Sequence, residues 1–350
     1  MFADPGSGYS YSRTDNPSVD AFAAAAASLE GEGAAGQALA SGTAATTAVL
    51  LALCSAGSHV VAPREVYGGT WALLTRQLAR FGVTTTFVDG RDLTAVRAAL
   101  RDGTAVLWAE TLANPTMSVA DLPAVSALAR QAGVPLVVDS TFAPPPVCRP
   151  LEHGADLVVH SATKYHGGHS DVTGGLVVGD PGLVARVREV RVDTGACLGP
   201  DDAVLLHRGL ATLPLRVERQ CATALQVAAA LEQHPRVRAV DHPGLPSHRD
   251  HDLAVRLLHP GRYGAVLTVT PHGGRAAGLA LVDGLRLMAR ATSLGGTVTK
   301  AVHCASTTHR MLSEQALADA GIDPGAVRVS VGLEDPEDLV ADLVQALDRA

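Results

Sequence analysis

The chain has 350 residues, of which 47% are apolar, so it is long enough to bury the core of one large domain and a smaller one. Its formal net charge of −7 argues against binding to nucleic acid or to an anionic membrane, because both partners require a basic surface. The five cysteines include no C-x-x-C pair, which argues against a disulfide framework or a zinc ribbon and favours a cytoplasmic location. Neither a signal-peptide pattern nor an apolar run of about 18 residues occurs, so no membrane span is predicted.

Short apolar runs alternate with helical patterns up to residue 200. The predicted strands are apolar on both faces, as in a sheet covered by helices, and lie at 58–62, 83–88, 104–109, 135–139, 156–161 and 174–178. Helices are predicted at 65–80, 92–100 and 121–132, and the alanine run 23–27 also favours a helix. This alternation predicts an α/β fold with a mostly parallel sheet.

The pattern changes near residue 200. A long helix is predicted over 201–234, and the later segments are 237–241, 264–270, helices at 274–284, 310–320 and 336–348, and a strand at 327–331. They predict a second, smaller α+β domain. We expect a short N-terminal arm at 1–16, a large domain at 17–215 and a C-terminal domain at 216–350.

Two local patterns suggest ligand sites that we disfavour. Residues 31–36, GEGAAG, match the G-x-G-x-x-G loop of dinucleotide-binding proteins, which must follow a strand and open a helix. The preceding segment favours a helix, so we interpret 31–36 as a helix-ending loop, which argues against a nicotinamide dehydrogenase. The second pattern is a group of metal-ligand side chains: His160, His166, His169 and Asp171. Their spacing matches no zinc motif, so no metal site is predicted.

Reactive side chains gather where two neighbouring predicted strands end. One strand ends at Asp139, and the next delivers Ser161, Thr163 and Lys164 to the same edge, where α/β sheets bind ligands. Two hydroxyls and an amine suit an anion together with a covalent site, because a lysine that loses its proton becomes a nucleophile. The alternative is that these are solvated surface groups.

Two further segments carry groups that suit anions. Ser41 precedes an apolar helix, so the amides of Gly42 and Thr43 lie at a helix N-terminus, which can bind phosphate or be capped by Ser41 alone. In the strand 327–332, Arg328 faces away from the valines and can hold a carboxylate, although the pattern is also typical of an exposed strand.

One run resembles the cofactor-lysine motif of the Cys/Met-metabolism family of pyridoxal phosphate enzymes: VVHSATKYHGGHSDVTGG, 158–175. Other motifs similar to that family follow in order: YSRTDNPS (11–18), VYGGT (66–70), ETLANPT (110–116), VVDSTFA (137–143), GLATLPLRVER (209–219), PGLPSH (243–248), SLGG (293–296) and VRVSVGLED (327–335). The resemblance covers essentially the whole chain. It implies fold type I of the PLP-dependent transferases, which is aspartate-aminotransferase-like, with pyridoxal 5′-phosphate (PLP) as cofactor. It also implies β/γ-elimination on a small γ-substituted L-amino acid, with γ-replacement by a synthase as the alternative.

The resemblance implies a role for each matching cofactor residue. Lys164 would bind the cofactor covalently, Asp139 would pair with its pyridine nitrogen, and Tyr67 would stack on its ring and transfer protons. Asn114 would lie near the ring hydroxyl. The phosphate would be held by amides and hydroxyls: Gly42, Thr43, Ser161 and Thr163.

The family pattern also implies residues for the substrate and for assembly. Arg328, with Ser293 beside it, would bind the substrate carboxylate, and Thr292 would lie near the substrate. Tyr11 and Arg13 would reach the phosphate site of a neighbouring subunit, with Tyr11 also near the substrate. The implied assembly is a homotetramer, a dimer of dimers with shared active sites.

The sequence departs from the family at positions that bear on the substrate. Members that handle cystathionine tend to carry acidic residues at the positions of Ser10 and Thr292, so cystathionine is disfavoured. Gly69 replaces a cysteine common in methionine γ-lyases, which argues against methionine. Other departures are Ser140, Pro146, His166, Gly167, Cys304 and Thr307. We therefore expect altered specificity for an uncommon γ-substituted amino acid. Because family members usually begin earlier, we also expect either a missing arm or a more open site.

Overall fold

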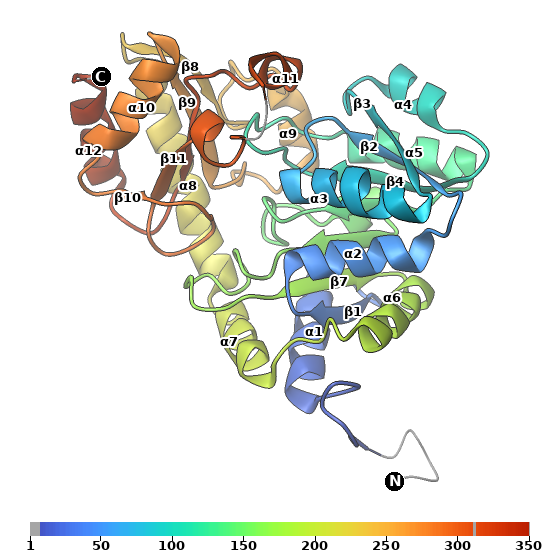
Figure 1. Cartoon of the computed structure of the whole chain (residues 1–350). Helices are drawn as coiled ribbons and strands as arrows, with labels where there is room; N and C mark the ends of the chain where they lie inside the picture. The colour runs from blue at the N-terminus through green and yellow to red at the C-terminus, as the bar shows by residue number, and fades with distance from the viewer. Residues whose placement is uncertain (1–7, 311–312, 350) are drawn as a thin grey trace.

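Two β-sheets and the helices around them form the part of the chain that the computed structural model describes, residues 8–310 and 313–349 (Figure 1). The first sheet has seven strands: β1 (Ala35–Leu39), β2 (His59–Pro63), β3 (Thr84–Val88), β4 (Thr104–Glu110), β5 (Leu136–Asp139), β6 (Leu157–His160) and β7 (Gly175–Gly179). Their order across the sheet is β1-β7-β6-β5-β4-β2-β3. Only β7 runs antiparallel to its neighbours, so the prediction of a mostly parallel sheet is confirmed.

Apolar side chains on both faces of this sheet are buried, which explains the unbroken apolar runs in the sequence. Val137 packs into one core cluster, and the next residue, Val138, packs into another. The surrounding helices are α1 (Pro17–Glu30), α2 (Gly42–Leu53), α3 (Gly68–Ala72), α4 (Leu93–Ala99), α5 (Leu122–Ala132), α6 (Pro181–Thr194) and α7 (Pro200–Leu210). A π-helical turn (Leu73–Gln77) and short 3₁₀ turns (Leu78–Phe81 and Pro150–His153) complete this part.

The second sheet has five strands in the order β10-β11-β12-β9-β8. These strands are β8 (Val237–Asp241), β9 (Val266–Pro271), β10 (Ala289–Arg290), β11 (Lys300–His303) and β12 (Val327–Ser330). The accompanying helices are α8 (Leu213–Glu232), α9 (His251–Leu257), α10 (Gly274–Gly284), α11 (Glu314–Asp319) and α12 (Pro336–Leu347), with a 3₁₀ turn at Cys304–Ser306. Within the described ranges, none of the helices is long and apolar enough to cross a bilayer.

Helix α8 lies between the two parts in the sequence and contacts the second sheet and the loop after β6 (Figure 1). From its first part, Arg216 donates to the carbonyl of Tyr165 at 2.9 Å, next to Lys164. One turn later, Gln220 donates to the carbonyls of Gly296 at 2.7 Å and Val331 at 3.2 Å. The helix therefore joins the loop that carries Lys164 to the strand that carries Arg328.

Several predicted boundaries are wrong. The helix predicted over 201–234 is two helices, because Pro214, which lacks an amide hydrogen, lies in the first turn of α8 and separates it from α7. The helix predicted over 65–80 is three shorter turns. Strand β1 and helix α6 were not predicted, and the helix predicted over 310–320 falls partly outside the described residues.

The GEGAAG segment follows helix α1 and leads into a strand. This order is the reverse of the strand-to-helix context that a dinucleotide-binding loop needs. The interpretation of 31–36 as a loop is correct for its first four residues, whereas Ala35 and Gly36 already belong to β1.

Candidate active site

A cavity of about 440 Å³ lies between the carboxyl edge of the seven-stranded sheet and residues of the C-terminal part. It is lined by every predicted site residue except Tyr11 and Arg13: Gly42, Thr43, Tyr67, Asn114, Asp139, Ser161, Thr163, Lys164, Thr292, Ser293 and Arg328. This volume is in the range of small-molecule sites. A second hollow near Glu65, of about 40 Å³, is too small for such a ligand.

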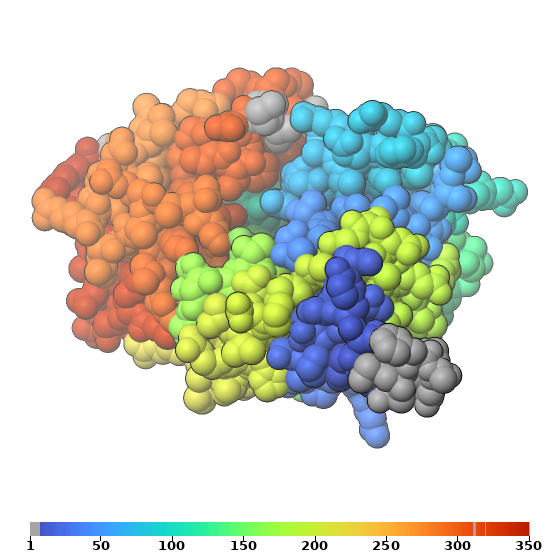
Figure 2. Space-filling view, turned by 60° about the horizontal axis from the view of Figure 1, so that its bottom comes forward, coloured from blue at the N-terminus to red at the C-terminus, as the bar shows by residue number. Residues whose placement is uncertain are grey.

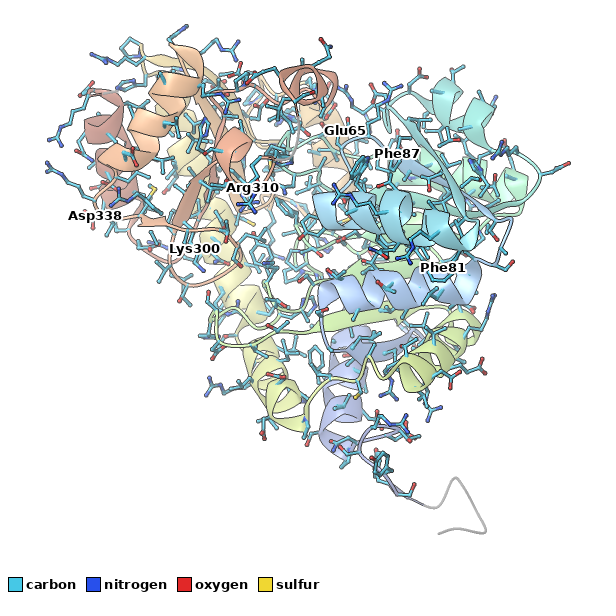
Figure 3. All side chains as sticks on the ribbon, viewed as in Figure 1. Glu65, Phe81, Phe87, Lys300, Arg310 and Asp338 are labelled. Atoms are coloured by element: carbon cyan, nitrogen blue, oxygen red, sulfur yellow. The ribbon has the colours of Figure 1, made fainter. Side chains whose placement is uncertain are left out.

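Lys164 follows β6 and is held by a residue of the C-terminal part. Its Nζ donates to Ser293 Oγ at 2.8 Å. Burial lowers the pKa of Lys164 to about 8, and the positive charges of Arg328 and Lys300 act in the same direction. Lys300 lies in the C-terminal part and donates to Ser170 at 2.9 Å (Figure 3). Lys164 therefore loses its proton more readily than an exposed lysine, as a nucleophile or proton acceptor requires.

Ser293 has a left-handed backbone, with φ of +81°. Residues other than glycine adopt this conformation at a cost, and such positions cluster at functional sites. The hydroxyl of Ser293 accepts from Lys164 while its carbonyl accepts from Arg328 at 2.9 Å. One residue therefore holds both cationic side chains of the cavity.

Asp139 ends strand β5 at the cavity wall. The amide of Thr141 donates to its Oδ1 at 2.9 Å. Burial raises the pKa of Asp139, while hydrogen bonds from Thr141 and the charge of His160 oppose that rise. A partly buried carboxylate that lines a cavity is suited to a cationic group of a ligand.

Gly42 and Ser161 approach each other closely where helix α2 begins. A Cβ on Gly42 would lie 2.7 Å from the Cβ of Ser161, so the position requires glycine. Ser41 caps the helix by accepting from the Ala44 amide at 3.1 Å, which leaves the preceding amides of the first turn without intrahelical acceptors. With the neighbouring hydroxyls of Ser161 and Thr163, these amides suit a phosphate group.

Arg328 on β12 is buried, with only 3% of its surface exposed, so the alternative of an exposed strand face is wrong. Its Nη1 donates to Asn114 Oδ1 at 3.1 Å and its Nη2 donates to the Ser293 carbonyl. Its buried Nε has no partner. Burial lowers the pKa of Arg328. A buried guanidinium with an unused donor at a cavity is suited to an anion such as a carboxylate.

Tyr67 is the residue immediately before helix α3, and 51% of its surface is exposed. Its amide donates to Glu110 Oε1 at 2.6 Å, and its ring lies over Gly69, where an added Cβ would be 2.5 Å from the ring. Glu110 and Thr308 line the cavity but were not predicted as site residues. The position of Glu110 beside Asp139, at the ends of adjacent strands, is the signal that could have identified it.

Tyr11 and Arg13 lie outside this cavity. Figure 2 shows the N-terminal segment, in dark blue, against the yellow-green surface of α6. Arg13 donates to the carbonyl of Val192 at 2.9 Å, and its guanidinium lies 5.5 Å from the ring centre of Tyr11. Within one chain these two side chains do not contribute to the cavity.

The histidines at the end of β6 and in the loop after it make contacts within the protein. His160 lies 2.5 Å from the Glu30 carboxylate, with both side chains fully buried, and its ring centre is 4.7 Å from that of His166. His169 Nδ1 lies 2.8 Å from the Gly167 carbonyl. In the described part of the chain, no group of three or more potential ligands could hold a metal ion.

Comparison with known proteins agrees with the site. Residues 2–348 match the model of the Cys/Met metabolism PLP-dependent enzyme family. The chain is 44% identical to the L-methionine gamma-lyase of Pseudomonas putida, over 99% of this chain and 87% of that protein. It is 42% identical to the cystathionine gamma-synthase of Mycobacterium bovis, over 97% of this chain and 86% of that protein. The crystal structure of metB from Corynebacterium glutamicum superposes with a TM-score of 0.94 at 37% identity, and the match covers 99% of this chain and 89% of that one.

The fold and the site define a PLP-dependent enzyme of fold type I, as the sequence predicted. The chain belongs to the Cys/Met metabolism family of PLP-dependent enzymes. Its cavity has the groups that this cofactor needs: the amine of Lys164, the carboxyl of Asp139 and the cradle at Gly42. The residues present therefore fit the cofactor.

Proposed function

We propose that this enzyme is a PLP-dependent carbon–sulfur lyase that catalyses β/γ-elimination, with γ-elimination as its main reaction. Its substrate would be a small γ-substituted L-amino acid, and its products a keto acid, ammonia and the released γ-group. The single observation that carries this proposal is the joint placement of Lys164, Asp139 and Arg328 around one cavity. Full-length identity to a protein named L-methionine gamma-lyase supports the reaction type.

We assign the roles of the residues from their chemistry. When bound, PLP supplies an electron sink that stabilises the negative charge left on Cα after its proton is removed. Asp139 would hold the pyridine nitrogen, and Lys164 would bind the cofactor and then carry protons between Cα and the γ-side of the substrate. Arg328 would orient the α-carboxylate, and Tyr67 would donate a proton to the leaving group.

The substrate class follows from the charges of the cavity. The acidic and basic residues among its described lining are Glu110, Asp139, Lys164 and Arg328, all near the strand ends or in the proposed carboxylate site. Most of the other lining residues are apolar or carry hydroxyl groups, among them Thr46, Thr70, Leu73, Leu112, Phe142, Thr292 and Thr308, and Asn114 adds an uncharged amide. A charged distal group would be left without a partner there, so we propose an uncharged γ-substituent.

The test is a comparison of keto-acid and ammonia release from methionine, O-acetylhomoserine, a γ-halo analogue and cystathionine, with PLP present. We expect the uncharged γ-substituents to be turned over faster than cystathionine, whose distal end carries charges. Fastest turnover of cystathionine would contradict the proposed substrate class. Turnover of methionine faster than all O-acyl and γ-halo analogues would contradict the expectation of an uncommon substrate but not that of an uncharged one.

The relative named cystathionine gamma-synthase supports γ-replacement as a second candidate. The two reactions differ in what adds after the γ-group leaves, so the same assay with an added thiol separates them. Formation of a new thioether with little keto acid would identify a synthase.

We also propose a homotetramer in which Tyr11 and Arg13 reach the phosphate site of a neighbouring subunit. The exposed face of Tyr67 and the position of these two residues outside their own cavity support a shared site.

We further propose domain limits at 17–215 and 216–350, supported by the two separate sheets. The free thiol state of the five cysteines supports a cytoplasmic location.

A further inference from the structure

Two neighbouring residues that line the cavity carry carboxyl groups. Glu110 ends β4 and Asp139 ends β5, and the two residues are direct neighbours across these parallel strands. Both line the cavity, and only 8% of the Glu110 surface is exposed. The proposed mechanism uses Asp139 but gives no task to Glu110.

The surroundings favour a charge on only one of the two groups. Two neighbouring carboxylates that are shielded from water repel each other, which favours a proton on one of them. Asp139 accepts hydrogen bonds from Thr141 and lies in the field of His160, both of which favour its charged form. Glu110 accepts from the Tyr67 amide, while Glu65, which lies near the start of α3 (Figure 3), adds a further negative charge.

The pKa shifts agree with this geometry. Burial raises the pKa of Glu110 well above its usual range, and the charge of Asp139 raises it further. The amide of Tyr67 provides the opposing contribution, which is smaller than these two. These directions favour Glu110, rather than Asp139, as the carboxyl that keeps its proton.

The bond between Glu110 and Tyr67 also fixes the position of Tyr67. The Tyr67 amide donates to Glu110, and the Tyr67 carbonyl accepts from the Trp71 amide at 2.9 Å, so its backbone is held on both sides. Its ring lies against Gly69, but half of the side-chain surface is open. The backbone anchor at Glu110 thus determines where the ring stands over the cavity.

We propose that Glu110 is a positioning residue: as a neutral carboxyl it anchors Tyr67 and leaves Asp139 as the only anion for the cofactor nitrogen. This proposal rests on the proposed function, because it assumes that Tyr67 and Asp139 act on bound PLP. It predicts that the hydrogen-bond acceptor of Glu110 matters and that its negative charge does not.

The test compares Glu110→Gln, which keeps the acceptor and is always neutral, with Glu110→Ala, which loses the acceptor. Glu65→Gln is the matched control, because it removes a nearby carboxyl that does not bind Tyr67. The first measurement is a pH titration of the absorbance of the bound cofactor without substrate, so its result does not depend on which amino acid the enzyme prefers. The second is kcat and KM for the best substrate.

We expect the titration midpoint of Glu110→Gln to stay within about 0.3 pH unit of the wild-type value, because no charge is lost. If Glu110 were ionised in the wild type, Glu110→Gln would remove a negative charge that stabilises the titrating cationic nitrogen. The titration midpoint would then fall by about one pH unit or more, and this result would overturn the proposal. Glu110→Gln should retain kcat within about threefold, whereas Glu110→Ala should lose about tenfold or more in kcat with a smaller change in KM. Equal losses in both variants, or full activity of Glu110→Ala with its cofactor bound, would also overturn it.

Discussion

Replacing Gly42 by alanine would test the phosphate cradle. The added methyl group would lie 2.7 Å from the Cβ of Ser161 and 2.9 Å from both its Cα and its Oγ. Carbon atoms in contact normally stay about 3.5–4.0 Å apart, so the start of α2 and the Ser161 backbone would have to separate by about 1 Å. Such overpacking costs about 1–3 kcal/mol. Because it displaces the amides and hydroxyls proposed to hold the phosphate, most of this cost should appear in cofactor binding.

A loss of about 1–3 kcal/mol corresponds to a PLP dissociation constant raised by about 5- to 150-fold. The assay is a titration of the apoenzyme with PLP, followed by the absorbance of the bound cofactor. Gly31→Ala is the control, because its Cβ would meet only Leu151 Cδ1 at an ordinary 3.9 Å. The reasoning is refuted if Gly42→Ala binds PLP as tightly as the wild type and Gly31→Ala.

Two further predictions concern the cationic groups of the cavity. Because the pKa of Lys164 is lowered to about 8, the rate at which apoenzyme attaches PLP should rise with pH through about 8 and level off above it, as the neutral amine becomes the main form. Stopped-flow absorbance measures this rate, and a rate that does not change with pH would contradict the assignment. Arg328→Lys should raise KM by about tenfold or more with a smaller effect on kcat, because a lysine cannot replace the paired guanidinium donors, each worth about 1.5–3 kcal/mol. Steady-state kinetics check this, and an unchanged KM would place the carboxylate elsewhere.

The sequence predicted the parallel strands of the first sheet well because most of them are apolar runs with buried side chains, whereas the edge strand β3, TTTFV, is only partly buried. Strand β1 escaped notice because AGQAL is short and contains Gln37, whose amide is buried and donates to the Ala38 carbonyl. Helix α6 was missed because PGLVARVREVRVDT has many charged residues and little contrast between its faces. The break before α8 could have been predicted from the sequence, because Pro214 lies inside the predicted long helix and proline disfavours a helix interior.

Local sequence was sufficient to place Asp139 at the end of one strand and Lys164 in the loop after the next, and both line the cavity. The same pattern also allowed solvated surface groups, so their proposed roles came from the family resemblance. The burial of Arg328 and the contact between Ser293 and Lys164 depend on how the C-terminal part packs against the first sheet, which no local pattern encodes. The role proposed for Glu110 likewise needed the strand register.

Helix α8 has a consequence for how the chain can vary in length. It contributes no residue to the described cavity lining, yet Arg216 holds the loop after Lys164 and Gln220 holds the segment around Arg328. One inserted residue between them would turn the second contact by about 100° and move it by about 1.5 Å along the helix axis. The distance between the proposed cofactor and carboxylate sites therefore depends on the number of residues between Arg216 and Gln220 in this helix. Surface loops can tolerate insertions, but an insertion in this helix would change the position of one site relative to the other.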